Sequence, residues 1–248
     1  MSEYTTKDFV LKELELNRGS YITGSALAKA KGVSRNAIWK AISDLRNDGY
    51  NIEAVSNKGY MLEGDSDIIS IAGIESYLSQ CTTLRDADIK HILSQITIYD
   101  ELPSTNRAAK MNLIMDELQK RIIIARTQTS GQGHSGSRYD SPEGGIYLSI
   151  ILTPDEIKKP PIKTTRIGSR VGDIISEITG KTITYDKKTN RIYIGKKKVS
   201  GILTEYFADL ETSEISGYVI GIGIKYPKLP KNKTIALLLN SFYSDYSI

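Results

Sequence analysis

A glycine-punctuated segment carries the residues best suited to binding chemistry. Gly131, Gly133 and Gly136 recur between apolar runs at 122–125 and 146–151. Glycine has no Cβ, so it tolerates positive φ and lets backbone amides approach a ligand closely, as an anion-binding nest requires. Taken alone, the segment is as typical of a mobile turn as of an ordered ligand loop.

Two further groups of small residues mark positions where a ligand could contact the backbone. Ser104 and Thr105 precede a helical pattern, where a hydroxyl caps the helix and also faces any polar group at its N-terminus. Gly221 and Gly223 lie in the last apolar run, where glycine usually marks close approach by a ligand or another backbone.

The titratable residues exclude several kinds of site. Cys81 is the only cysteine, so neither an internal disulfide nor a cysteine-based metal site can form within one chain. His91 and His134 are the only histidines, which argues against a zinc enzyme and leaves little room for a serine–histidine triad. We therefore predict no metal site.

Short apolar runs alternate with helical patterns in the second part of the chain. Helices are predicted from Thr105 to about Lys120 and from Thr164 to about Thr179, and a turn from Cys81 to Asp88. Many of the apolar runs are joined by hairpin-length loops, which favours an α+β fold with a mixed sheet and packed helices over a doubly wound parallel sheet. The predicted strands are 96–99, 122–125, 146–152, 183–185, 192–194, 199–206 and 215–226.

The first part of the chain has the pattern of a winged helix-turn-helix. A helix from Asp8 to Asn17 precedes a second helix that ends at Gly32. Ser34 then caps a third helix from Arg35 to Asn47, after a turn of helix-turn-helix length. The segment 50–62 alternates around a turn and predicts a two-stranded hairpin, the wing.

The third helix is predicted to present one face to DNA. Its apolar residues fall on one side at helical spacing and its polar residues on the other. Arginines on its flank, Arg35 and Arg46, are placed to reach phosphates, although a solvated surface would have the same pattern. The predicted DNA-binding residues are Ser34, Arg35, Asn36, Trp39, Lys40 and Lys58.

Bulk properties fit this organisation. The 248 residues are 40% hydrophobic and carry a formal net charge of +4, which is compatible with nucleic-acid binding. No apolar stretch approaches the ~20 residues needed to span a bilayer, and the N-terminus lacks a secretory pattern, so we expect a cytoplasmic protein with no membrane contact. We predict a DNA-binding domain at 1–63, a linker and connecting helix at 64–90, and a ligand-binding domain at 91–248.

The order of the motifs identifies a family resemblance. The winged helix is followed by Ser-Thr-Asn, Gln-Thr-x-Gly-x-Gly, Ser-Pro-x-Gly, Lys-Lys-x-Val-Ser-Gly-Ile-Leu-Thr-Glu and Gly-Ile-Gly-Ile, in that order. This succession resembles the bifunctional biotin protein ligases that double as biotin operon repressors. The resemblance implies synthesis of biotinyl-AMP from biotin and ATP and transfer of biotin to a lysine of biotin carboxyl carrier protein. It also implies a homodimer that binds operator DNA, and a biotin ligase catalytic-domain-like fold for 91–248.

The same resemblance assigns site residues. Lys187 would stabilise negative charge at the adenylate linkage as the catalytic lysine. Residues that would contact biotin or border its pocket are Ser104, Thr105, Gln128, Gly131, Gly133, Gly201 and Leu203. Residues that would face the phosphates and ATP are His134, Arg138, Asn190 and Arg191.

The chain departs from the family pattern on the ATP side. The phosphate loop of the family, Gly-Arg-Gly-Arg-x-Gly-Arg, is replaced from Gly131 to Ser137 by a segment without arginine. Arg191 stands where the family has a carboxylate that helps to hold Mg²⁺. The resemblance therefore implies Mg²⁺ as a possible cofactor, but this chain has replaced one of the groups that would bind it. A small C-terminal β-barrel domain that the family carries is not within the 248 residues, so the chain resembles a divergent member lacking it.

Two functional hypotheses follow from these departures. The first is an active biotin protein ligase that also represses transcription in response to biotin. The alternative is a catalytically impaired, ligase-like transcriptional repressor that senses biotin or a related ligand without turning it over. The altered phosphate loop favours the alternative, and the retained Lys187 favours the first.

Overall fold

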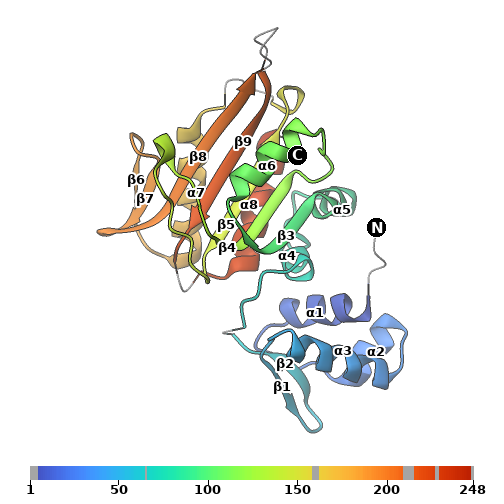
Figure 1. Ribbon diagram of the computed structural model, residues 1–248. Coiled ribbons are helices and arrows are strands. Elements are labelled where there is room, and N and C mark those ends of the chain that lie inside the picture. Colours follow the sequence, from blue (N-terminus) through green and yellow to red (C-terminus); the bar gives the residue numbers. More distant parts are fainter. Residues whose placement is uncertain (1–4, 65, 158–161, 209–214, 227–228, 247–248) are drawn as a thin grey trace. The chain divides into compact units, whose positions relative to one another are not determined.

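The chain folds into two compact units, residues 1–84 and 85–248 (Figure 1). The computed structural model describes residues 5–64, 66–157, 162–208, 215–226 and 229–246. The predicted linker at 64–90 includes Asp65, which lies outside the described residues. Helix α4, Ile71–Leu78, falls within that predicted linker and packs against α1, Thr6–Leu16, in the first unit.

The first unit is a winged helix-turn-helix, as predicted. Its remaining elements are α2 Gly24–Lys31, α3 Arg35–Asn47, β1 Ile52–Val55 and β2 Gly59–Leu62. Helix starts follow side-chain caps, since Thr5, Thr23 and Ser34 each accept a hydrogen bond from a backbone amide in the first turn. Gly32 ends α2 in the left-handed conformation, where glycine has no steric penalty.

The wing is anchored to the helices by its turn. β1 pairs antiparallel with β2, and Ile22 bridges to Tyr60 next to the turn. Gly59 has φ of +106°, and a Cβ there would lie 2.1 Å from the Ile22 carbonyl oxygen. Only glycine therefore fits at this position of the wing.

The second unit contains a seven-stranded mixed sheet within the described part of the chain, in the order β3-β4-β5-β9-β8-β7-β6. β3 and β4 are parallel and the other neighbours are antiparallel, which confirms the predicted α+β class. The strands are β3 Ile96–Leu102, β4 Ile122–Gln128, β5 Ile146–Leu152, β6 Ile183–Asp186, β7 Arg191–Ile194, β8 Lys197–Ala208 and β9 Ile215–Ile224.

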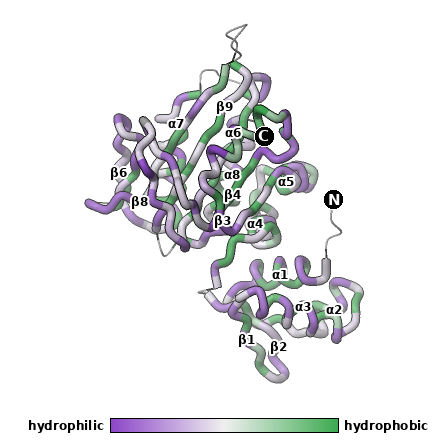
Figure 2. The backbone as a smooth tube through the Cα atoms, viewed as in Figure 1, coloured by the Kyte–Doolittle hydropathy of each residue, from purple (hydrophilic) through white to green (hydrophobic). Residues whose placement is uncertain are grey.

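Helices cover both faces of this sheet. α6 packs on β4, β5 and β9, while α7 and α8 lie on the opposite face (Figure 1). The central strands are hydrophobic and the sheet end at β6 and the start of β8 is hydrophilic (Figure 2). The helical elements are α5 Asp86–Ser94, α6 Thr105–Ile114, α7 Thr164–Thr179, α8 Lys231–Tyr246 and the 3₁₀ turns His134–Gly136 and Pro154–Glu156.

Helix α5 corrects the predicted turn at Cys81–Asp88. The helix begins at Asp86 because Asp88, at its third position, accepts a hydrogen bond from the Arg85 amide at 3.0 Å. The Tyr243 hydroxyl of α8 donates to the same carboxylate at 2.7 Å. Arg85 and Tyr243 together hold the pKa of Asp88 well below its usual range. Within the described residues, no helix is long and apolar enough to cross a membrane.

Candidate functional site

A pocket with a cavity volume of about 130 Å³ lies on the face of the sheet that α6 covers. The start of α6, the glycine-rich loop and strands β7, β8 and β9 form its walls. Most of the predicted ligand residues line it: Ser104, Thr105, Gln128, Gly133, His134, Arg138, Asn190, Arg191, Gly201 and Leu203. Gly131 and Lys187 are not among the lining residues.

One end of the pocket is a neutral hydrogen-bonding network at the start of α6. Gln128 Oε1 accepts from the Thr105 amide at 2.8 Å, and Gln128 Nε2 donates to Ser141 Oγ at 2.7 Å. The Ser149 hydroxyl donates to Asn106 Oδ1 at 2.6 Å and lies 2.8 Å from the Thr105 hydroxyl. Because each member is held by its neighbours, this end offers fixed polar atoms to a neutral ligand group.

Glu205 of β8 ties this network to the sheet. Its carboxylate accepts from Asn106 Nδ2 at 2.8 Å and forms an ion pair with Lys110 Nζ at 2.5 Å. Gly221 makes room for the Asn106 side chain, since a Cβ at Gly221 would lie 2.1 Å from Asn106 Oδ1. The glycine expected to admit a ligand or a backbone thus admits a side chain of the site.

Tyr139 forms the floor between the two ends. Its ring covers Gly223, where a Cβ would lie 2.5 Å from the ring, and Gly201, where a Cβ would lie 3.0 Å away. These glycines are direct partners on β9 and β8. The Tyr139 hydroxyl donates to the Gly223 carbonyl at 2.8 Å, and the ammonium groups of Lys198 and Lys225 lie 4.8 and 5.0 Å from the ring centre. Burial raises the pKa of Tyr139 well above its usual range, so the phenol remains neutral.

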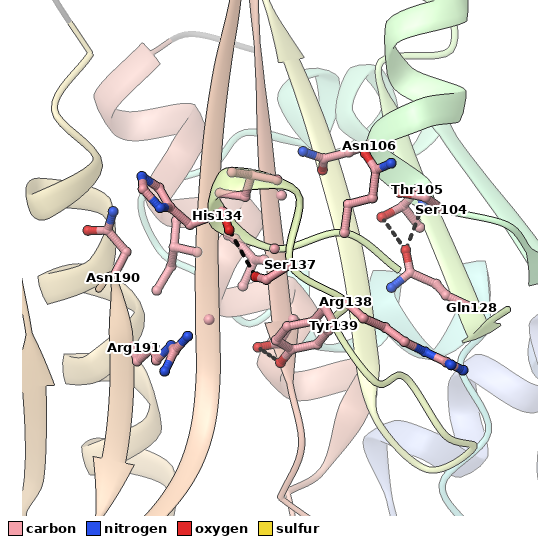
Figure 3. A pocket seen from close by; sticks show the side chains of 18 of the residues that line it. Ser104, Thr105, Asn106, Gln128, His134, Ser137, Arg138, Tyr139, Asn190 and Arg191 are labelled. Atoms are coloured by element: carbon pink, nitrogen blue, oxygen red, sulfur yellow. Dashed lines mark hydrogen bonds between the residues drawn. The ribbon is translucent and has the colours of Figure 1, made fainter. Parts of the chain in front are cut away.

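The opposite end of the pocket is cationic. Asn190 and Arg191 lie across the pocket from Ser104, Thr105 and Gln128 (Figure 3). Asn190 adopts a φ of +52° and accepts from the Tyr185 hydroxyl at 2.9 Å. Among the residues that the structure describes, no aspartate or glutamate lines the pocket.

Lys198 adds a second positive charge at this end. It lines the pocket, and desolvation lowers its pKa, with Arg191 and Lys225 acting in the same direction. Burial is the larger cause of this lowered pKa, and the repulsion from the nearby positive charges adds to it. An anionic ligand group would relieve this repulsion.

The glycine-rich loop is ordered by its own backbone bonds. The Gly133 amide donates to the Ser137 carbonyl at 2.7 Å, and the Tyr139 amide donates to the Gly131 carbonyl at 2.7 Å. A Cβ at Gly131 would lie 2.5 Å from the Tyr139 carbonyl oxygen. The Gly133 amide is therefore engaged within the loop, contrary to the expectation that it faces an anion.

The predicted cations differ in their position. Lys187 is exposed in the turn between β6 and β7. Arg138 is exposed at the pocket rim, and in the view of Figure 3 its side chain extends away from Arg191. His134 lines the pocket in the 3₁₀ turn.

Sequence reasoning did not assign several side chains that line the pocket, among them Asn106, Tyr139 and Lys198. Asn106 completes the Ser-Thr-Asn motif, and Lys198 precedes the Val-Ser-Gly of β8, so both stood within quoted motifs. Tyr139 had no local signal, because its role depends on paired glycines far along the chain.

The proposed DNA face lies on α3 in the first unit. Arg35, Asn36, Trp39 and Lys40 are all exposed, and Trp39 retains 65% of its accessible surface. Ser34 caps the helix, and Lys58 of the wing lies 5.6 Å from the Tyr21 ring centre.

Arg46, which was predicted to reach phosphates, is bonded to the backbone of the wing. Its Nε and a terminal nitrogen donate to the Ile52 carbonyl at 3.0 and 2.7 Å, which fastens α3 to the wing. Both flank arginines, Arg35 and Arg46, are exposed.

Comparisons with known proteins support both units. Residues 99–225 match the model of the biotin/lipoate A/B protein ligase family, and residues 6–61 match an HTH domain. Two similar relatives are both described as bifunctional ligase/repressor BirA. The one from Bacillus subtilis is 34% identical over 86% of this chain, and the one from Bacillus spizizenii is 35% identical over 88%. The chain spans 62% and 64% of the lengths of these relatives.

A solved structure shares the fold of the second unit. The biotin acetyl coenzyme A carboxylase synthetase from Helicobacter pylori, crystallised with bound biotinylated ATP, aligns with a TM-score of 0.50 and 21% identity. The alignment covers 60% of this chain and 74% of that one.

Proposed function

The chain belongs to the biotin/lipoate A/B protein ligase family, and from this membership and the polarity of its pocket we propose that it is a biotin protein ligase. In the proposed reaction the biotin carboxylate attacks the α-phosphate of ATP, which releases pyrophosphate and forms biotinyl-AMP. A lysine amine of biotin carboxyl carrier protein then attacks the acyl carbon and releases AMP.

The observation that carries the proposal is the opposition of a neutral and a cationic end in one pocket. Thr105, Asn106 and Gln128 present fixed donors and acceptors suited to the uncharged ureido group of biotin. Arg191 and Lys198 present positive charge suited to the biotin carboxylate and the phosphates. A ligand that is neutral at one end and anionic at the other is therefore oriented by charge alone.

The first unit extends the proposal to DNA. The exposed face of α3 and the wing residue Lys58 are placed as in helix-turn-helix proteins that read a major groove. Both Bacillus relatives bear the name ligase/repressor. We therefore propose that the chain represses transcription at an operator as a homodimer, with biotin as its signal.

The position of Lys187 favours the second candidate function. The family resemblance implies that Lys187 stabilises negative charge at the adenylate linkage. In the structure Lys187 is exposed and does not line the pocket. A ligase-like repressor that senses biotin without turnover would keep the neutral end of the pocket and need no catalytic lysine. The two functions share biotin binding and differ in adenylate formation.

Biotin binding is tested by calorimetric titration of the full chain. Gly221→Ala would push a methyl group into Asn106 and break the neutral end, so we expect biotin affinity to fall at least about tenfold. Gln128→Ala should act in the same direction without a clash. Gly64→Ala, where a Cβ meets nothing within 4 Å, is the matched control and should bind as the parent does. If both pocket variants bound biotin with the affinity of the parent, biotin would not bind at the neutral end of the pocket.

A further inference from the structure

Arg191 is a cation of the pocket, and no acidic side chain in the described part of the chain forms an ion pair with it. It is partly buried on β7 and extends toward Tyr139 (Figure 3). Among the described residues, no hydrogen bond or ion pair engages its guanidinium. Removing a charge from water without a counterion is costly. An anion that enters the pocket would supply the missing counterion.

Carboxylates on the two strands that flank β7 are bonded to other groups. Glu205 is held by Asn106 and Lys110. Asp186 accepts from the Lys188 amide at 3.0 Å and from the Thr189 hydroxyl at 2.6 Å. None of these carboxylates lines the pocket within the described part of the chain.

Asp140, on the loop beside Tyr139, faces Lys225 at 3.4 Å and is 74% exposed. It too is absent from the lining of the pocket. The described residues contain no group of three or more histidine, cysteine, aspartate or glutamate side chains that could hold a metal ion.

These residues do not fit a divalent cation. Mg²⁺ at a nucleotide site ordinarily takes one or two protein carboxylates together with the phosphates. Here Arg191 and Lys198 bring two positive charges to a pocket that no carboxylate of the described residues lines, and these charges would repel the ion. A guanidinium can instead hold two phosphate oxygens directly.

We propose that Arg191 and Lys198 bind the phosphates of the nucleotide as the metal-free polyanion, in place of a divalent cation. The proposal rests on the proposed function for the presence of a nucleotide, and it assigns the chemical form in which that nucleotide is bound.

The test is calorimetric titration of the full chain with inorganic pyrophosphate and with ATP, in EDTA and in excess Mg²⁺. The parent should bind both in EDTA, and Mg²⁺ should weaken binding because it competes for the phosphate oxygens. Arg191→Gln should weaken binding in EDTA at least about tenfold. Arg191→Asp should make Mg²⁺ strengthen binding. Lys196→Asp makes the same change of charge at the exposed β7–β8 turn. This variant should behave as the parent does, with tighter binding in EDTA than in Mg²⁺.

Biotin titrated into the same samples separates this proposal from the proposed function. Binding of pyrophosphate and ATP only with Mg²⁺, or no binding under either condition, would overturn the metal-free site, and biotin binding would still support a biotin protein. Metal-free phosphate binding without biotin binding would support the cationic site and reject the biotin function. If Lys196→Asp and Arg191→Asp weakened phosphate binding in EDTA equally, the effect would come from the net charge of the protein, and the proposed phosphate site at Arg191 and Lys198 would be rejected.

Discussion

Lys198 and Lys187 flank the same strand, β7, yet their surroundings differ. Lys198 lies beside the Tyr139 ring and Arg191 in the pocket, where desolvation lowers its pKa. Lys187 is exposed in the turn before β7. Only a charge near the reacting atoms can stabilise a developing oxyanion strongly, because water screens an exposed one. The geometry therefore favours Lys198 for the role first assigned to Lys187.

The two lysines can be distinguished by substitution. We expect Lys198→Ala to slow biotinyl-AMP formation in single-turnover assays at least about tenfold, the loss of one charge-assisted contact. Lys187→Ala should have the smaller effect and serves as the matched lysine control. A larger loss with Lys187→Ala would return the catalytic role to that residue and imply that the turn closes over the pocket when ligand binds.

At the scale of elements, α3 and the wing are held together and form the proposed DNA-binding surface. Arg46 links them through the Ile52 carbonyl, and Gly59 sets the wing against Ile22. The side chains left exposed on this unit include Arg35 and Lys40. Arg46 thus helps to fix the position of the wing relative to α3.

DNA binding by α3 has a salt signature. The variant Arg35→Ala with Lys40→Ala removes two exposed cations, so we expect weaker binding of a fluorescent random-sequence duplex and a shallower dependence on salt, by up to ~0.9 per lost phosphate contact. Fluorescence anisotropy at several salt concentrations measures both. Lys90→Ala removes an exposed cation of the second unit and should leave the slope unchanged. An unchanged slope in the double variant would contradict the placement of the DNA face.

Local signals predicted most of these elements. The bounds of α3 were predicted correctly, from Arg35 to Asn47. They could be predicted because the signals, such as the Ser34 cap, lie in the segment itself. The α7 bounds, Thr164–Thr179, and the β5 bounds were likewise predictable from periodicity. Helix α5 was missed because part of what holds it comes from Tyr243, at the far end of the unit.

Site residues could be predicted where they belong to one short motif. They could not be predicted where the fold brings together residues from distant parts of the sequence. Ser104, Thr105 and Gln128 were identified from motifs, and the structure brings them together at one end of the pocket. Tyr139 could not be identified, because its place depends on the pairing of Gly201 with Gly223. Lys198 could not be identified either, because the positive charges near it, Arg191 and Lys225, come from other parts of the sequence.

At the scale of the whole molecule, the chain combines a unit that contains the proposed ligand pocket with a unit that carries the proposed DNA-binding surface. The pocket of the second unit is charged for a ligand with an anionic end, and the first unit presents a helix-turn-helix face. The family match covers the sheet and its pocket, and the HTH match covers the first unit. This arrangement suits a protein in which one small molecule serves both chemistry and transcriptional control.

The most direct test of the central claim is to incubate the purified chain with biotin and ATP and to assay biotinyl-5′-adenylate by mass spectrometry. The account predicts that the adenylate forms and that Lys198→Ala greatly reduces it. Absence of the adenylate while biotin still binds would contradict the ligase function and leave a biotin-sensing repressor. Absence of both would contradict the assignment of the pocket to biotin.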